Sequence, residues 1–114
     1  MQRKHAYAYV PQATGEAFET YARRCGLTSK SELLKLLIRR ELELNRLHVA
    51  GPGRQPPSPG RTKITAHLCD ELESALSAHA DGLGVTTSHA AALLVEQELS
   101  ERWLEAALVW EPPQ

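Results

Sequence analysis

Side chains that can form hydrogen bonds recur at every second residue in two short stretches of this chain. The stretches are KHAYAYV, residues 4–10, and RTKITAHL, residues 61–68. Their outward candidates are His5, Tyr7, Tyr9, Lys63, Thr65 and His67. Alanine, valine, isoleucine and leucine occupy the positions between them. A period of two is typical of a strand with two different faces, so each stretch predicts a strand with one apolar and one hydrogen-bonding face.

A second set of polar groups stands where two helices are predicted to begin. In the turn at residues 26–32, Gly26 favours the end of one helix, and Ser29 with Glu32 forms a Ser-x-x-Glu capping box for the next. In the turn at residues 82–88, Thr86 or Thr87 can cap. Free amide groups at a helix start attract anions, so these turns are candidate phosphate sites. The candidates are Ser29, Lys30, Ser31, Thr86, Thr87 and Ser88. Capping without any ligand is the alternative for both turns.

The sequence contains no constellation that indicates catalysis or a cofactor. Its five histidines have no paired helical spacing and no adjacent cysteine, which argues against a metal site. Cys25 and Cys69 form no CxxC motif and no disulfide framework. Glu96 and Glu98 are predicted on different sides of a helix and are interpreted as solvated. We therefore expect no enzyme, no cofactor and no metal.

The predicted elements occur twice in the same order. The first copy has a strand, a helix at 14–24 and a second helix at 30–47, and the second copy has a strand, a helix at 70–81 and a helix after the turn. His79 is expected to complete the apolar stripe of the helix at 70–81. The apolar series Leu34, Leu37, Ile38 and Leu42 corresponds to Ala91, Leu94, Val95 and Leu99. Tyr7 and Thr65 are 58 residues apart, and Leu34 and Ala91 are 57 apart, so the chain is a degenerate internal repeat.

A segment rich in proline and glycine separates the copies. Residues 48–60 hold four prolines and three glycines without periodicity, which predicts a partly extended linker. The predicted organisation is a first unit at 1–47, this linker at 48–60, a second unit at 61–110 and a tail at 111–114. A lone unit of this size has too little core and leaves both edges of its strand unpaired, so we expect the two units to pair.

Charge is divided unequally between the copies. Residues 1–55 hold ten Lys/Arg against five Asp/Glu, and residues 56–114 hold three against nine, although the net charge is only −1. Basic residues of the first copy that could attract a polyanion are Arg23, Arg24, Lys35, Arg39 and Arg40. The chain has no apolar run of membrane length, and MQRKHAYAYV lacks the apolar core of a signal peptide. These features predict a cytoplasmic protein without a membrane partner.

The order strand, helix, Gly-x-x-Ser-x-Ser-Glu turn, helix resembles the ribbon-helix-helix DNA-binding family. The resemblance covers residues 5–47 and 62–104 and is carried by the first turn, whereas His89-Ala90 replaces Glu32-Leu33 in the second. It implies a mainly α fold in which two β-α-α units form an intramolecular pseudo-dimer with a two-stranded antiparallel ribbon. The tandem layout is similar to relaxosome accessory proteins of conjugative plasmids and to Arc- and methionine-repressor-type regulators.

The resemblance implies sequence-specific binding of double-stranded DNA, with the ribbon in the major groove. The six outward strand residues would contact bases, and the polar residues of the two turns would contact phosphates. Lys63 and Thr65 stand where the methionine-repressor branch places its base-reading pair. The implied role is a conjugation or mobilisation accessory protein or a transcriptional repressor, with a relaxase or another protein as a further partner and with association of monomeric pseudo-dimers on DNA. A merely solvated strand face is the alternative for the base contacts.

A different class of function is a protein-interaction module. In that hypothesis the acidic second unit docks a partner through carboxylates and two tryptophans. The residues concerned are Glu96, Glu98, Glu101, Glu105, Trp103 and Trp110.

Overall fold

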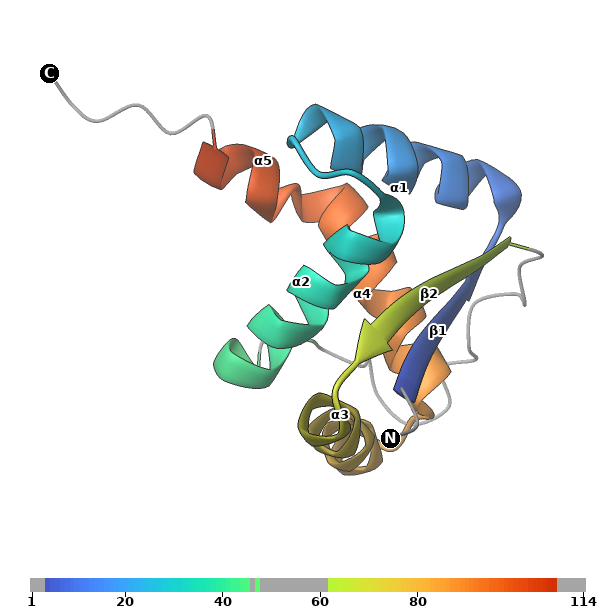
Figure 1. Cartoon of the computed structure of the whole chain (residues 1–114), viewed down its shortest axis with the longest axis vertical. Coiled ribbons are helices and arrows are strands. Elements are labelled where there is room, and N and C mark those ends of the chain that lie inside the picture. The colour runs from blue at the N-terminus through green and yellow to red at the C-terminus, as the bar shows by residue number, and fades with distance from the viewer. Residues whose placement is uncertain (1–3, 46, 48–61, 109–114) are drawn as a thin grey trace, which may run out of the picture.

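The described part of the chain is mainly helical, with one two-stranded antiparallel sheet. A computed structural model describes residues 4–45, 47 and 62–108. Their elements, in chain order, are β1 (Lys4–Val10), α1 (Gln12–Arg24), α2 (Lys30–Leu44), β2 (Thr62–Leu68), α3 (Asp70–Leu83), α4 (Thr87–Glu101) and α5 (Trp103–Leu108) (Figure 1). The predicted class, mainly α with a two-stranded antiparallel sheet, is confirmed. The predicted linker at 48–60 and tail at 111–114 lie outside the described residues.

The sheet forms by pairing β1 with β2 in a symmetric register. Tyr7 lies opposite Thr65, and these two residues hold the same place in the internal repeat. The flanking outward pairs are His5 with His67 and Tyr9 with Lys63. Antiparallel pairing sends α1 and α3 away from opposite ends of the sheet (Figure 1). Each strand supplies the other with the hydrogen-bonding partner that a lone strand would lack.

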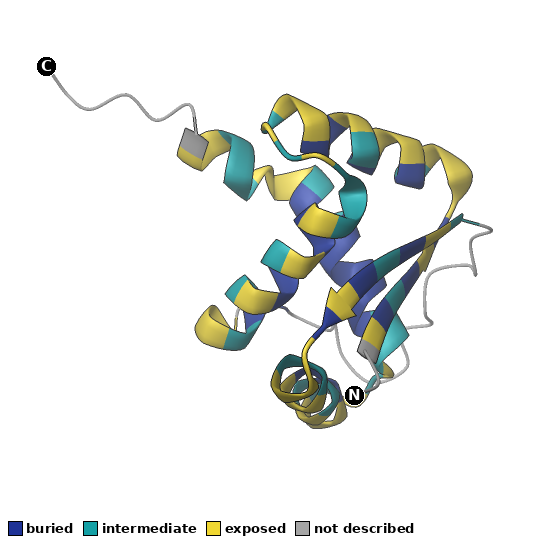
Figure 2. Ribbon diagram, in the orientation of Figure 1, coloured by how far each residue is buried: buried dark blue, intermediate teal, exposed yellow. Residues whose placement is uncertain are grey.

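Burial alternates along both strands, as Figure 2 shows by bands of buried residues between intermediate or exposed ones. Side chains therefore point alternately to the two faces of the sheet. The inward residues are almost fully buried; they are Ala6, Ala8, Val10, Ile64, Ala66 and Leu68. Burying a side chain of valine, isoleucine or leucine stabilises a fold by about 1.5–3 kcal/mol. The inward face therefore fixes which residues face outward, and it anchors the sheet to the helices.

The helices cover the inward face crosswise. α4, from the second copy, packs against β1 from the first copy, and α2 packs against β2. α2 and α4 also contact each other and bury Leu34, Leu37, Leu94 and Val95. Each copy thus covers the strand of the other, so the two copies share one hydrophobic core.

Local signals set the helix ends, with some shifts from the predicted bounds. α1 begins at Gln12 instead of residue 14, and Gly15 lies so close to β2 that a Cβ there would be 2.7 Å from Thr62 Cγ2. α2 ends at Leu44 instead of residue 47, because Asn45 takes the left-handed conformation. α3 continues to Leu83 before Gly84 ends it in the same way. α5 was not predicted as a separate helix.

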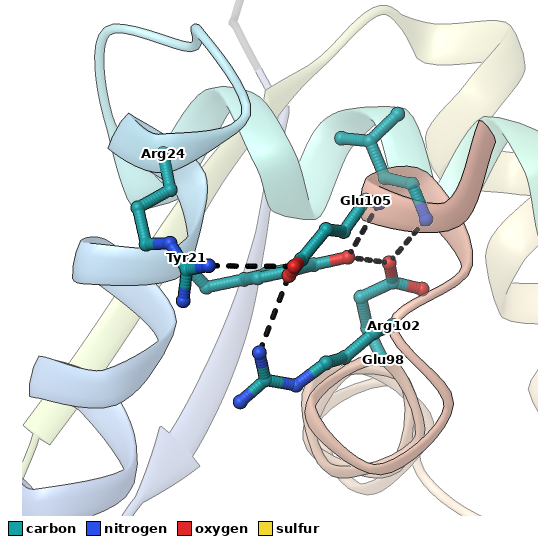
Figure 3. A network of polar contacts seen from close by, with 6 residues as sticks. Tyr21, Arg24, Glu98, Arg102 and Glu105 are labelled. Carbon is teal, nitrogen blue, oxygen red and sulfur yellow. Dashed lines mark hydrogen bonds and ion pairs between the residues drawn. The ribbon is translucent and has the colours of Figure 1, made fainter. Parts of the chain in front are cut away.

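Two buried glutamates tie the copies together. Glu41 in α2 and Glu98 in α4 are only 1% and 0% exposed, and they are counterparts in the repeat. The hydroxyl of Tyr21 in α1 donates to Glu98 at 2.5 Å, as drawn in Figure 3. His79 Nε2 in α3 lies 2.7 Å from a carboxylate oxygen of Glu41. Tyr21 and His79 are themselves counterparts, so the first helix of each copy holds the glutamate of the other.

The same carboxylates also fix the chain beyond each second helix. The Leu104 amide donates to Glu98 at 2.8 Å, and the Leu47 amide donates to Glu41 at 2.9 Å. A buried carboxylate is costly unless donors satisfy it, and here backbone and side-chain donors converge on both. The interpretation of Glu98 as solvated was wrong, because local spacing does not show that Tyr21 and Leu104 reach it. His79 was predicted only as part of the apolar stripe of its helix, and its polar contact with Glu41 was not foreseen.

α5 is held against α1 through the Glu98 network. The Glu105 amide donates to the Tyr21 oxygen at 3.0 Å, while the Glu105 carboxylate accepts from Arg24 at 3.3 Å and Arg102 at 3.2 Å (Figure 3). Burial, with the hydrogen bond to Glu98 second, raises the pKa of Tyr21 well above its usual range. Tyr21 therefore remains a protonated donor at neutral pH.

We expect the protein to be a folded monomer, because β1 and β2 pair within one chain and share one core. Light scattering at low micromolar concentration should give a mass near 12.6 kDa. A compact obligate dimer of twice that mass would contradict the intramolecular pairing.

Tyr21→Phe should destabilise the fold by about 1–3 kcal/mol, because it removes a donor from a buried carboxylate. The matched control is Tyr9→Phe, which removes the same hydroxyl from a side chain that is 44% exposed. Urea denaturation followed by circular dichroism measures both changes in unfolding free energy. Equal stabilities for the two variants would show that the Tyr21–Glu98 bond contributes nothing.

Candidate nucleic-acid interface

The six predicted base-contacting residues lie together on the outward face of the sheet. This outer face, defined by His5, Tyr7, Tyr9, Lys63, Thr65 and His67, carries four exposed residues, while Tyr7 and Thr65 are half-buried at its centre. The face consists of three cross-strand pairs, and the pair Tyr7–Thr65 lies between the other two. The arrangement exposes hydrogen-bonding and aromatic groups on a rigid support that the helices hold from behind.

Aromatic rings dominate the β1 side of the outer face. The rings of His5 and Tyr7 are stacked, with centroids 6.0 Å apart and planes 12° apart, and the Tyr9 centroid lies 6.4 Å from that of Tyr7. His5 also meets His67 edge to face at 4.6 Å. The ammonium group of Lys63 lies 4.9 Å from the centroid of the Tyr7 ring. His5, Tyr7 and Tyr9 form the aromatic row of β1, and Lys63 supplies a cation directly beside it.

The two ends of the outer face differ chemically. Antiparallel pairing places one residue of each strand at each end, so His5 and His67 form one end and Tyr9 and Lys63 form the other. One end therefore offers two imidazoles, and the other offers a phenol and an ammonium group. The two copies carry different residues at equivalent strand positions, and this makes the two ends of the outer face chemically different.

The start of α2 is capped as predicted, with one change in the partner. Ser29 accepts from the Glu32 amide at 3.3 Å, which is half of the predicted capping box. The Glu32 carboxylate accepts from the hydroxyl and the amide of Thr28 instead of the Ser29 amide. The Thr28 hydroxyl, followed by its amide, lowers the pKa of Glu32, so this carboxylate is ionised at neutral pH. The predicted phosphate-contacting residues Ser29, Lys30 and Ser31 are all partly exposed beside it.

The start of α4 lacks such a carboxylate. Of the two threonines proposed as its cap, Thr86 fills the role and accepts from the His89 amide at 3.0 Å. Thr86 is exposed, and Thr87 and Ser88 are partly exposed. Because the first turn of α4 contains no acid, its amide groups face less competition from a side-chain anion than those of α2.

Charged side chains distinguish the helices around the sheet. Lys35 and Arg39 are exposed on α2, and Arg23 is exposed on α1, where it forms an ion pair with Glu19 at 3.7 Å. Asp70, Glu71 and Glu73 lie in the first turn of α3. Arg24 is also exposed but pairs with Glu105. The expectation that Arg40 adds to the basic surface was wrong, because its side chain is 9% exposed and lies 3.5 Å from Glu98.

Only part of the proposed acidic docking surface is available. Glu98 is buried, and Glu105 pairs with Arg24 and Arg102. Trp103 is half-buried, with the Arg40 guanidinium 4.3 Å from its ring centroid. Glu96 is partly exposed and Glu101 exposed, whereas Trp110 lies outside the described residues.

Sequence reasoning missed the polar groups that hold this surface in place. Tyr21, Glu41, His79 and Glu98 do not lie on the outer face, but they join the helices behind it. The available signal was positional, since Glu41 and Glu98 are counterparts in the repeat, as are Tyr21 and His79. Equivalent polar residues at equivalent core-side positions indicate a shared structural contact.

The described residues contain no group of three or more His, Cys, Asp or Glu side chains placed to hold a metal ion. None of the helices in the described part of the chain has the length and apolar character of a membrane span. Comparison of the chain with protein-family models, curated proteins and solved structures finds no match.

Proposed function

We propose that this protein binds double-stranded DNA with sequence preference by inserting the outer face into the major groove. The observation that carries the proposal is the collection of six hydrogen-bonding or aromatic side chains on one face of a two-stranded antiparallel sheet. A two-stranded ribbon fits the major groove, where every base pair presents a distinct pattern of donors, acceptors and methyl groups. The opposite face of the sheet is fully used by the core.

We further propose that the fold is a single-chain ribbon-helix-helix pseudo-dimer. Three observations support this assignment. Tyr7 pairs with its own counterpart Thr65, each strand packs on the second helix of the other copy, and the two buried glutamates have counterpart partners. All three are expected of two similar units related by an approximate two-fold axis.

Base reading would differ between the ends of the outer face. At one end the Lys63 ammonium can donate to the O6 and N7 acceptors of guanine, and at the centre Thr65 offers a hydroxyl and a methyl group. The other end offers the imidazoles of His5 and His67 instead. The preferred target is therefore not a good palindrome, in contrast to the target of a symmetric homodimer.

The helix starts would fix the register of the protein on the duplex. Amide groups at the start of α2, with Ser29, Lys30 and Ser31, would hold one phosphate, and those of α4, with Thr86, Thr87 and Ser88, would hold another. Lys35 and Arg39 would add attraction that does not depend on sequence. The acidic residues in the first turn of α3 would repel the phosphates, so the two copies would bind the DNA backbone with unequal strength.

The biological role we propose is that of a cytoplasmic accessory protein for conjugation or mobilisation, or of a transcriptional repressor. In the first role a relaxase is the candidate protein partner, and copies of the protein would associate on DNA. A second candidate function, docking of a protein on the acidic second copy, is favoured by the acids in the first turn of α3 and by exposed Glu101.

Lys63→Ala and Thr65→Ala should each weaken binding to the preferred duplex by about 1–3 kcal/mol for each base contact that is lost. The preferred duplex is obtained by selection from a random library, and affinities are measured by fluorescence anisotropy on it and on unrelated DNA. Lys35→Ala is the matched control for Lys63→Ala, since it also removes one lysine charge but at a position outside the outer face. It should weaken binding to both duplexes alike.

Equal losses on both duplexes for Lys63→Ala and Thr65→Ala would contradict base reading by the outer face. Failure to enrich any duplex, with the fold intact by circular dichroism, would contradict DNA binding itself.

A further inference from the structure

Hydrogen bonding alone does not explain why the aromatic row of β1, which consists of His5, Tyr7 and Tyr9, carries three rings. Phenol rings expose mainly apolar surface, and Tyr9 is 44% exposed. Three rings occur on one strand at every second residue, whereas the facing strand carries Lys63, Thr65 and His67. The two strands therefore suit different chemical groups in the same groove.

We infer that Tyr7 and Tyr9 recognise the C5-methyl groups of thymine, so that the DNA beneath β1 must contain thymine. This inference rests on the proposed function. The thymine methyl is the apolar group that base pairs present in the major groove, and apolar side chains read it by direct contact. Thr65, opposite Tyr7 at the centre of the sheet, carries a further methyl group on the same face.

The contacts of the Tyr7 ring favour a thymine methyl over a base of single-stranded nucleic acid at the centre of the outer face. A base that stacks on a tyrosine needs a free ring face. The Tyr7 ring is already stacked with His5 and has the Lys63 ammonium 4.9 Å from its centroid. A methyl group is small enough to contact the remaining exposed surface without displacing these neighbours. Single-strand binding is thus the competing outcome.

Position matters as well as composition. Tyr9 pairs across the sheet with Lys63, so a thymine contact by Tyr9 and a guanine contact by Lys63 would fall at the same end of the outer face. Tyr7 occupies the centre. The inference therefore places the required thymines at the centre and at the Lys63 end of the target, and none of these contacts at the His5–His67 end.

The experiment replaces each thymine of the selected duplex, one at a time, by deoxyuridine, which removes only the C5-methyl group. We expect affinity to fall about fourfold for each methyl that contacts a ring, the factor for burying one carbon group of that size. Tyr9→Ala should abolish the loss at the Lys63 end, and Tyr7→Ala should abolish it at the centre. Tyr9→Phe should preserve it, because the contact uses the ring and not the hydroxyl. Lys63→Ala should also preserve the loss on deoxyuridine substitution, although it weakens binding to the unsubstituted duplex.

Several results would overturn the inference while leaving duplex binding intact. These are a selected target without thymine beneath β1, unchanged affinity for every deoxyuridine duplex, losses that persist in both alanine variants, or Tyr9→Phe behaving like Tyr9→Ala. Tighter binding to the single strand of the same sequence would favour base stacking instead. Absence of binding to any duplex would refute the proposed function and this inference with it. Thermal melts of each variant confirm that the fold is retained.

Discussion

The pairing of β1 with β2 is the constraint on which the rest of the structure depends. Neither strand has another neighbouring strand in the described part of the chain, so all backbone hydrogen bonds of the sheet join β1 to β2. Because side chains alternate with a period of two, a shift of β1 by one residue relative to β2 would turn Ala8 outward and Tyr7 inward while Ile64 kept its place. The register that places Tyr7 opposite Thr65 is thus also the register that builds the core and creates the outer face.

The crosswise packing explains why each copy depends on the other. β1 is covered by α4 and β2 by α2, so separating the copies would expose both apolar strand faces. The carboxylates of Glu41 and Glu98 add a polar constraint at the same places, because each is hydrogen-bonded to a side chain from the first helix of the other copy. Removing one partner from a buried carboxylate is strongly destabilising, which makes the arrangement hard to loosen on one side only. This packing holds the backbone of both strands, from which the side chains of the outer face project.

Periodicity and capping were sufficient to predict the order of the elements from β1 to α4 and the two faces of each strand. These features are local: the two-residue alternation of KHAYAYV and the Ser29 cap depend on neighbouring residues alone. The burial of Glu98 and Arg40 depends on which distant helices meet, and a charged residue on a predicted helix gives no sign of that. The separate helix α5 was missed for a related reason, since Arg102 takes a left-handed conformation that favours glycine or asparagine.

We propose that a duplex binds at the outer face and at the starts of α2 and α4. Amide chemical-shift mapping of the ¹⁵N-labelled protein, titrated at low salt with a random-sequence duplex and then with a selected one, tests it most directly. This proposal predicts chemical-shift changes concentrated in β1, β2 and residues near Ser29 and Thr86, with little change in α3 and α5. Shifts confined to α3 and α5, or no shift with either duplex, would contradict it.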